Sequence, residues 1–535
     1  MFKYIYKKLN FIRLKNLGIL DENIEDNTEQ VKLSCDLNEN IKILKNILGG
    51  SDDIVYRAFS FGENNKMNAA IIFLSDMVKG SSVNNIMMQL FNYNKLNNME
   101  IKVELNDMDI IKSNIISVGE VNKTQYINEV VDGCLSGDAV LLIDGLDESL
   151  IIYSRDYKGR RVEESKTEAV VRGPREGFSE NISINISLLR HKIRNPNLTF
   201  KSIRIGRQTR TSIYIVYLKG IANPKLVGEV CKRLKRINTD AILESGYIEQ
   251  FIEDTPYSIF PTVGNSEKPD TAAAKILEGK VGILVDGTPF ILTVPMLFIE
   301  GFQNAEDYYS RTYYSSILRI LRFICFIITI LLPATYVMLA AFHQELIPTT
   351  LLFTIAAGRE GVPFPAIMEA GLMVITFEIL REAGVRLPRP IGQAVSIVGA
   401  LVIGQAAVSA GLVGGILVIV VALTGVSSFV VPVFTDTASI LRIILLILSG
   451  TLGIFGVGLG LLVTLIHVVS IRSFGTPYLS PLAPLEKDDL KDSFIRTHMW
   501  KMSKRPHNIG VKNIKRQGEN LKPEPPKDDD KLKNV

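Results

Sequence analysis

The sequence predicts an integral membrane protein of the α+β class, with two duplicated α/β cytoplasmic subdomains followed by an α-helical transmembrane bundle. Two observations predict this. A pattern of apolar runs, helix and turn in the first half recurs about 140 residues later, and the apolar residues concentrate between Ile317 and Ser470. A chain of 535 residues is also longer than one hydrophobic core usually supports, so several domains are expected.

Two pairs of matching segments define the repeat. An apolar run ending in Lys-Gly occurs at Ile71–Gly80 and again at Thr211–Gly220. A run rich in Val, Ile and Leu and ending in Asp-Gly occurs at Leu135–Gly145 and again at Leu277–Gly287, so the final glycines are offset by 140 and 142 residues in the two pairs. Asp-Gly between apolar runs is typical of a tight turn, so each copy is expected to hold a strand, a helical region and a closing hairpin.

The composition divides the chain into five expected parts. They are a basic N-terminus with a flexible linker (1–50), two α/β subdomains (51–165 and 166–305), a transmembrane region (306–475) and a charged tail (476–535). The linker and the end of the tail are polar and bury too little apolar surface to offset the entropy of ordering. The first 20 residues carry too many Lys and Arg residues for a signal-peptide core, so the first half is expected to stay in the cytoplasm.

About four membrane crossings are expected within 306–475. The charge-free run 323–341 is long enough for one crossing, and two shorter runs, 347–357 and 366–379, together form a broken one around the sequence GREGVPFP. The charge-free run 391–435 crosses once with a re-entrant part, or twice, and 443–466 is the last span. Arginines mark the expected cytoplasmic side: Arg311, Arg319, Arg322, Arg381, Arg386, Arg389 and Arg472.

Two carboxylates lie at membrane depth, where a charge is costly and is expected to face a cavity, a partner or the bundle interior. Glu369 and Glu378 are nine residues apart and point to opposite sides of a helix, so they do not form an acid–base pair. Glu378 is expected to form an interfacial ion pair with Arg381. Glu369 has no charged partner at helical spacing and is therefore a candidate for a pore vestibule or an intersubunit contact.

A stripe of small and polar residues recurs at intervals of three and four in the long uncharged run. Its members are Gln393, Ser396, Ala400, Gly404, Ala407 and Gly411. Small residues let helix backbones approach closely, so helix packing is one interpretation. In the other, several copies of this helix surround an aqueous path, with Gln393 and Ser396 in contact with its water and Gln405 and Ser409 on the adjacent face. Replacing Gln405, Val408 or Ser409 is then expected to alter ion release. The sequence alone leaves both open.

Several function classes have no support in the sequence. A net charge of +4 and the lack of a nucleic-acid motif beside the basic stretch 190–210 argue against a nucleic-acid partner. The four cysteines are far apart and the five histidines are scattered, so no metal site is expected. Turn chemistry explains Asp144, Asp147 and Glu148 without a magnesium ion. No phosphate-binding, serine-hydrolase or zinc-protease motif occurs, so neither an enzyme nor a cofactor is expected.

Four stretches resemble one known family. They are TEAVVRGPREGFSE (167–180), LLRHKIRNPNL (188–198), SIFPTVGNSEKPDTAAAKILEGKVGILVDGTPF (258–290) and FEILREAGVRLPRPIGQAVSIVGALVIGQAAVSAGLV (377–413). They are similar to the A subunits of the GerA family of spore germination proteins, and the resemblance covers about Ile54 to Pro484.

The resemblance implies a subunit of a nutrient germinant receptor in the spore inner membrane. The partners that it implies are a transporter-like B subunit, a lipoprotein C subunit, membrane lipid and further copies of the same chain, with a pentamer as the expected assembly. It also implies a germinant-gated ion channel. A non-conducting scaffold that docks the B subunit and a secondary transporter are the alternatives.

Overall fold

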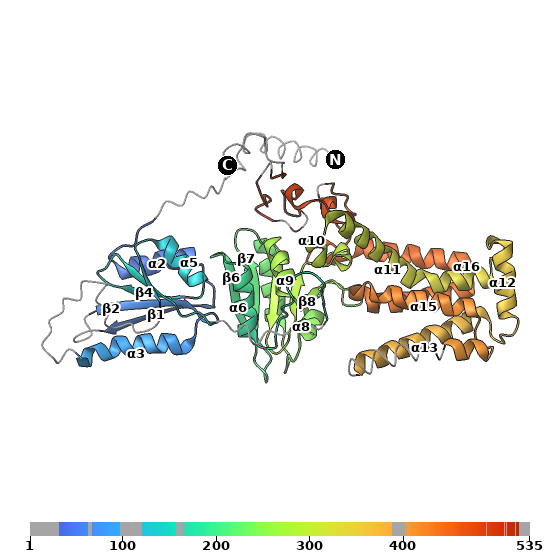
Figure 1. Ribbon diagram of the computed structural model, residues 1–535, viewed down its shortest axis with the longest axis horizontal. Coiled ribbons are helices and arrows are strands. Elements are labelled where there is room, and N and C mark those ends of the chain that lie inside the picture. The colour runs from blue at the N-terminus through green and yellow to red at the C-terminus, as the bar shows by residue number, and fades with distance from the viewer. Residues whose placement is uncertain are drawn as a thin grey trace, which may run out of the picture. The chain divides into compact units, whose positions relative to one another are not determined.

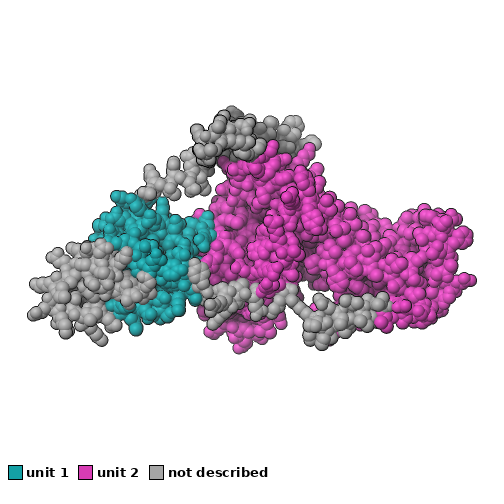
Figure 2. All heavy atoms as spheres, viewed as in Figure 1, with its two compact units in different colours: residues 1–157, 194–196 teal, residues 158–193, 197–535 magenta. Residues whose placement is uncertain are grey.

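The computed structural model describes residues 31–61, 67–96, 120–156, 164–165, 167–387, 402, 404–487, 489–507, 509, 511–518 and 521–523. The chain separates into two units, one made of residues 1–157 and 194–196 and the other of residues 158–193 and 197–535 (Figure 2). Each unit contains one α/β subdomain, and the second unit also contains the long apolar helices.

The first unit is a five-stranded sheet with helices on both faces (Figure 1). Its elements are α2 (Leu37–Ile47), β1 (Ile54–Phe61), β2 (Met67–Leu74), α3 (Gly80–Leu96), β3 (Val121–Thr124), α5 (Ile127–Leu135), β4 (Ala139–Ile143) and β5 (Ser149–Ile152). The strand order is β1-β2-β4-β5-β3, and all neighbours are antiparallel. Helices α2 and α5 pack on one face of the sheet, and α3 packs on the other.

The α/β subdomain of the second unit repeats this architecture. Its elements are α6 (Ile182–Lys192), β6 (Leu198–Ile205), β7 (Thr211–Leu218), α7 (Pro224–Arg236), α8 (Ser245–Ile252), β8 (Gly264–Ser266), α9 (Pro269–Leu277), β9 (Val281–Val285) and β10 (Ile291–Val294). The order β6-β7-β9-β10-β8 matches the first sheet strand for strand. The repeat in the sequence thus corresponds to two copies of one sheet topology, and the Asp-Gly glycines Gly145 and Gly287 have φ of 87° and 89°.

Continuous apolar runs form the inner strands because both faces of each sheet are covered. Successive side chains of a strand point to opposite faces. In β2, Ile71 therefore packs toward α3 while Ile72 packs toward α2 and α5. In β7, Ile215 packs toward α7 and α8, while Val216 packs toward α6 and α9. All residues of β4 and β9 are buried, which explains why no polar alternation marks these strands in the sequence.

A polar cap at the start of the first helix is also repeated. In the second unit Asn181 caps α6, and Asp286 Oδ1 accepts a hydrogen bond from the first helical amide at 3.3 Å. The buried side chain of Asn185 accepts from Ser179 N at 2.8 Å and donates to Ser179 O at 2.6 Å. The residues that make the same contacts around α2 in the first unit are Ser34, Asp36, Asn40 and Asp144.

The flexible linker expected at residues 1–50 is wrong from residue 31 onward. Residues 37–47 form α2, and Leu44 and Leu48 are fully buried in the core of the first unit. The apolar residues Leu37, Ile41 and Leu44 are spaced at helical intervals, but the surrounding Asp, Glu and Asn residues dominate the average composition. The first subdomain therefore begins before residue 51.

The apolar half of the second unit is a group of helices that lie alongside one another (Figure 1). They are α11 (Thr312–Ala341), α12 (Thr349–Arg359), α13 (Ala366–Arg386), a helical stretch at 404–409, α15 (Gly415–Phe429) and α16 (Thr435–Ser470). Helix α12 crosses the far end of the others. Among the described residues, two helices are long and apolar enough to cross a membrane, Thr312–Ala341 and Pro432–Ser470, and Gly415–Phe429 is a shorter apolar helix.

Element α16 is a helical hairpin. Gly453 interrupts its helical backbone with φ 58° and ψ −134°. A Cβ atom placed on Gly460 would lie 2.6 Å from Leu445 Cδ2, although 15 residues of straight helix would separate these positions by about 22 Å. The chain therefore reverses at Gly453 and forms two antiparallel arms, 435–452 and 454–470, each about 27 Å or less in length.

The two ends of α16 contact one loop of the α/β subdomain, which supports the reversal. Thr437 Oγ1 donates to Ile259 O at 2.5 Å, and His467 Nε2 lies 3.0 Å from Ser258 Oγ. In a straight helix Thr437 and His467 would be about 45 Å apart. The expected single span over 443–466 is therefore wrong, because a glycine with positive φ lets the chain turn back within it.

The expectation of a disordered charged tail also needs correction. Tyr478 is fully buried in a cluster of aromatic residues that includes Phe298 and Phe434. Ile509 and Val511 are buried in the second α/β core, on the side of the sheet that α7 covers. The few apolar residues of this segment are widely spaced in a basic sequence. The core residues that surround Ile509 and Val511 lie mostly more than 200 residues earlier in the chain, so local composition did not indicate them.

Replacing Asn185 with Ala should destabilise the second α/β subdomain by about 1–3 kcal/mol, because both backbone groups of Ser179 lose a buried partner. Hydrogen exchange of peptides covering 179–193 measures the effect. Asn185→Asp keeps the acceptor for Ser179 N and should fall between Ala and the unchanged chain. Equal exchange in all three proteins would contradict this role.

A pH-dependent destabilisation is expected from Glu249 in α8. Burial, followed by the charges of Glu253 and Glu244, raises the pKa of Glu249 from 4.5 to about 7. Below pH 4.5 the group is protonated in both the folded and the unfolded state. Stability is therefore lost as the pH rises from about 4.5 to 7, where only the unfolded state is fully ionised, and the loss persists above pH 7.

Glu249→Gln should accordingly raise the unfolding free energy by about 1–3 kcal/mol at pH 8 and leave it nearly unchanged at pH 4.5. Thermal unfolding of the detergent-solubilised chain at the two pH values measures this difference. Glu129→Gln, at an exposed position of α5, is the matched control. A gain of equal size at both pH values would contradict the assignment.

Candidate functional site

The carboxylate of Glu369 is buried where three segments meet. Its Oε1 accepts a hydrogen bond from Gly414 N at 2.5 Å, and its Oε2 lies 3.4 Å from Arg359 Nε. Glu369 is in the first turn of α13, where a negative charge also suits the helix dipole. Glu369 has no charged partner at helical spacing, and its ion-pair partner, Arg359, comes from the end of another helix, α12.

The predicted small-residue stripe is only partly described. Gln393, Ser396 and Ala400 lie outside the described residues. Gly404 and Ala407 are buried, and a Cβ atom on Gly404 would lie 3.3 Å from Val418 Cγ1 in α15. At these two positions the small side chains allow the helical stretch 404–409 to pack closely on its neighbours.

Gly411 ends this helical stretch with a positive φ of 65°. A Cβ atom at this position would lie 3.1 Å from Gly361 O in the loop between α12 and α13. A side chain here would therefore meet both backbone strain and a crowded carbonyl. Gly411 is positioned as part of the same junction that Glu369 holds together.

Gln405, Val408 and Ser409 are exposed in the stretch 404–409. The two polar side chains thus point away from the packed interior of their own chain. In a membrane, such groups require water or a neighbouring protein as a hydrogen-bonding partner.

Glu378 joins α13 to the first arm of α16. Arg381 Nη2 lies 2.7 Å from Glu378 Oε2, and the buried Arg442 also pairs with this carboxylate. Arg381 additionally donates to Ser439 Oγ at 3.0 Å. The ion pair expected from helical spacing is thus part of a larger contact in which Arg442, just before the apolar run 443–466, takes part.

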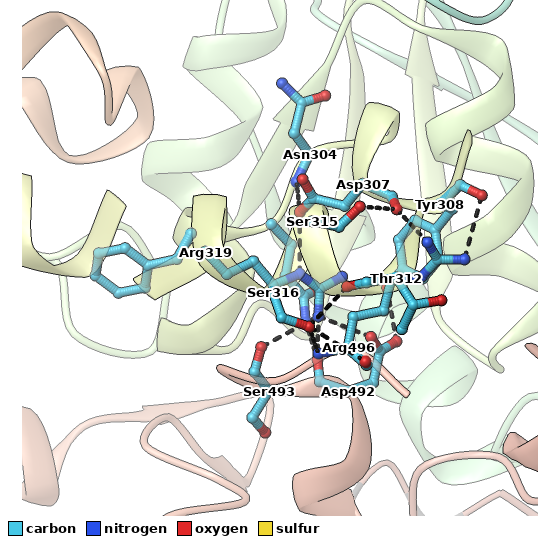
Figure 3. A network of polar contacts seen from close by, with 12 residues as sticks. Asn304, Asp307, Tyr308, Thr312, Ser315, Ser316, Arg319, Asp492, Ser493 and Arg496 are labelled. Carbon is cyan, nitrogen blue, oxygen red and sulfur yellow. Dashed lines mark hydrogen bonds and ion pairs between the residues drawn. The ribbon is translucent and has the colours of Figure 1, made fainter. Parts of the chain in front are cut away.

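A second network of charges surrounds the first turns of α11 (Figure 3). Arg319 is fully buried, and its guanidinium lies 3.0 Å from Asp307 Oδ2 and 2.7 Å from Asp492 Oδ1. Arg322 Nη1 lies 2.8 Å from the same Asp307 oxygen. Tyr308 donates to Asp492 Oδ2 at 2.6 Å, and burial raises the pKa of Tyr308 well above its usual value, so the phenol stays a donor.

Arg496 connects this network to the backbone of the residues just before α11. Its Nη1 donates to the carbonyl oxygens of Asp307 and Ser310 at 2.6 and 2.8 Å. Ser316 Oγ accepts from Arg496 N at 3.1 Å. These contacts hold the turn that precedes Thr312, the first residue of α11.

A buried pair, Lys280 and Glu300, connects β9 to the segment leading into α11. Glu300 also lies 3.5 Å from Lys275. Burial opposes ionisation of Glu300, but the charges of Lys280 and Lys275 outweigh it and hold the pKa of Glu300 below its usual range. Burial lowers the pKa of Lys280, while Glu300 acts in the other direction.

The described part of the chain contains no group of three or more His, Cys, Asp and Glu residues that could hold a metal ion. All four cysteines, Cys35, Cys134, Cys231 and Cys325, are free. The charged clusters above therefore join elements of the chain through ion pairs and hydrogen bonds.

A family model described as "Bacillus/Clostridium GerA spore germination protein" matches residues 42–508. The chain belongs to the GerA family. Spore germination protein KA of Bacillus subtilis (strain 168) is 42% identical over 503 residues, which cover 94% of this chain and 92% of that protein. Spore germination protein GerLA of Bacillus cereus is 38% identical, with 90% of this chain and 97% of that protein covered.

Two further comparisons place this GerA chain among related proteins. The uncharacterized membrane protein YfkQ of Bacillus subtilis (strain 168) is 41% identical over 94% of this chain and 98% of that protein. A crystal structure of the N-terminal domain of the A subunit of the Bacillus megaterium spore germinant receptor GerK3 is 36% identical. It covers 50% of this chain and 98% of that chain, with a TM-score of 0.39.

Several charged contacts that the sequence of this GerA protein did not indicate join residues distant in the chain. Asp492 lies 173 residues after Arg319, and Arg442 lies well after Glu378. Arg319 and Arg322 were interpreted only as markers of the cytoplasmic side. Their position at the start of an apolar helix was visible in the sequence, but their acidic partners were not.

Glu369→Ala should loosen the contacts among α12, α13 and the segment 411–415 in this GerA protein. Gly414 N and Arg359 would lose a buried acceptor, which should lower the local stability by about 1–3 kcal/mol. Hydrogen exchange of residues 411–415 should be about tenfold faster. Glu369→Gln retains an acceptor for Gly414 N and should show a smaller change. Glu382→Ala, which removes an exposed ion pair with Arg386, is the control. An equal effect of this change on residues 411–415 would contradict the role given to Glu369.

Proposed function

We propose that this protein is the membrane-embedded A subunit of a nutrient germinant receptor and acts in bacterial spore germination. Family membership and the names of the relatives support this role. The long apolar helices and a relative named as a membrane protein support its place in a membrane. By the family resemblance the membrane is the spore inner membrane, and the partners are a transporter-like B subunit and a lipoprotein C subunit.

Charge at the ends of the helices supports an orientation with the α/β subdomains in the cytoplasm. Arg311 precedes α11, Arg386 ends α13 and Arg472 follows α16. Arg381, near the end of α13, contacts Ser439 near the start of α16, so these helix ends lie on the same side of the group. Positive residues collect on the cytoplasmic side of membrane proteins.

The hairpin at Gly453 supports an arrangement with more passes than the four expected. Each arm of α16 is short but close to the thickness of a hydrocarbon core. The first arm begins and the second arm ends on the side of the α/β subdomain, where Thr437 and His467 contact its loop. An even number of passes keeps the N-terminal half and the C-terminal segment on one side.

Copies of the chain are proposed to form a germinant-gated ion channel. The observation that carries this proposal is the exposure of Gln405 and Ser409 on a helical stretch whose other side is buried. Lipid would leave both polar groups without partners, whereas a shared aqueous path would hydrate them. Val408 lies between them in the sequence and is also exposed, and its apolar side chain would narrow such a path.

Val408→Ser should therefore raise ion leakage about tenfold or more, because a polar group makes an apolar constriction easier to wet. Potassium release from liposomes that contain the purified chain measures the leakage. Ile419→Ser, at an exposed position of α15, is the matched control and should leave release unchanged. Without release from either variant or from the unchanged chain, a non-conducting scaffold becomes the better interpretation.

A further inference from the structure

The C-terminal segment, defined as residues 489–518, contacts two separate parts of the second unit. Its first portion, 489–496, lies against the start of α11, and its second portion, 503–518, lies against the α/β subdomain. The family resemblance assigned no role to this segment, and its composition predicted a solvated tail. Its contacts in the structure require a different explanation.

The first portion is held by buried charge. Arg319 donates to the carbonyl oxygens of Asp492 and Ser493 at 2.8 and 3.1 Å, in addition to its ion pair with the Asp492 carboxylate. Gln303 Nε2 donates to Asp492 O at 2.6 Å. Removal of Asp492 would leave a fully buried guanidinium with one carboxylate fewer, which is a costly change. This portion is therefore firmly attached to α11.

The second portion is a short backbone hairpin with an apolar tip. Arg505 N donates to Ile514 O at 2.7 Å, and Arg516 N donates to Ser503 O at 2.8 Å. Between these residues, Ile509 and Val511 insert into the core on the α7 side of the sheet. The hairpin thereby completes the hydrophobic core of a subdomain that begins more than 300 residues earlier.

Polar contacts fix the same hairpin to the end of α9. Arg505 Nε donates to Leu277 O at 3.0 Å, and Arg516 Nη1 lies 3.5 Å from Glu278 Oε1. A Cβ atom on Gly279 would lie 3.0 Å from Val511 Cγ2, so the glycine leaves room for this contact. These groups are only partly buried, so this attachment is weaker than the one at Arg319.

We propose that the C-terminal segment is a mechanical link that makes the second α/β subdomain and the first turns of α11 move together. Asp492 and Arg496 are positioning residues in this link, acting through α11. The hairpin 503–518 transmits displacement of the subdomain, because it fills the subdomain core at one end and continues into the buried charge network at the other. The link extends the proposed function. Only the expected change in ion release rests on the proposed channel; the existence of the link does not.

The first test removes the hairpin while leaving the buried network in place. A chain ending at Met502 is compared with a control chain ending at Gly518, and hydrogen exchange is followed in residues 312–322 at the start of α11. The shorter chain should exchange about tenfold faster there, and the control should match the full chain. Faster exchange confined to α7, with residues 312–322 unchanged, would show that the hairpin only covers the core and would overturn the proposal.

A charge exchange provides the second test without deletion. Glu278→Arg and Arg516→Glu should each accelerate exchange in residues 312–322 by about threefold or more, and the double variant should return it to within twofold of the unchanged chain. Arg207→Glu, which breaks an exposed pair with Asp240 at 3.1 Å, is the control. If both single variants leave residues 312–322 unaffected, or if the double variant does not recover, the link is refuted.

Ion release separates failure of the link from failure of the proposed function. In potassium-loaded liposomes, the chain ending at Met502 carrying Val408→Ser should differ at least threefold in release from full-length Val408→Ser. Equal release together with accelerated exchange would show that the link exists but does not affect ion release. If no chain conducts, the channel proposal fails, and the exchange measurements still decide whether the link exists.

Discussion

Burial of the Arg319 guanidinium is the constraint on which the junction between the α/β subdomain and the helices depends. A charge removed from water must be paired, and the chain supplies Asp307 from the segment before α11 and Asp492 from near its C-terminus. Tyr308 donates to the carboxylate of Asp492, and Arg496 donates to the backbone carbonyl oxygen of Asp307, so both residues support the two acidic partners. The buried cation thus holds the first portion of the C-terminal segment, 489–496, against the start of α11.

Much of the α/β architecture could be predicted because it is encoded by local pattern. The two Asp-Gly turns and the apolar runs before them gave the repeat, and both occupy equivalent places in sheets of the same strand order. Helix α2 and the hairpin at 503–518 escaped prediction for the opposite reason. Their apolar residues are few, and they become stable only against a core formed by distant segments. Average composition therefore suggested disorder where tertiary contacts impose structure.

The candidate residues of the helical region show where sequence spacing stops being informative. Spacing of three residues was sufficient to suggest that Glu378 meets Arg381, but it gave no indication of Arg442. For Glu369 the partner is on another helix, at a position that depends on how the loop 360–365 turns. The reversal at Gly453 was equally hidden, because a glycine-rich apolar run has the same composition whether it crosses once or folds back. The sequence did not indicate which residues of the stretch 404–409 face its own chain. In the structure Gly404 and Ala407 are buried, whereas Gln405 and Ser409 are exposed.

The two copies of the sheet carry charges of opposite sign at one equivalent buried position. Asp138 precedes β4 and forms an ion pair with Arg155 at 2.7 Å, within the first subdomain. Lys280 occupies the corresponding place before β9, and its partner is Glu300, on the segment that leads into α11. The two equivalent charges therefore have different partners: Asp138 pairs within its own subdomain, and Lys280 pairs with a residue of the segment that leads into α11. The two sheets keep one strand order although this charge differs, because apolar pattern specifies the strands. In the second copy the charge adds a buried ionic contact to the segment that leads into α11.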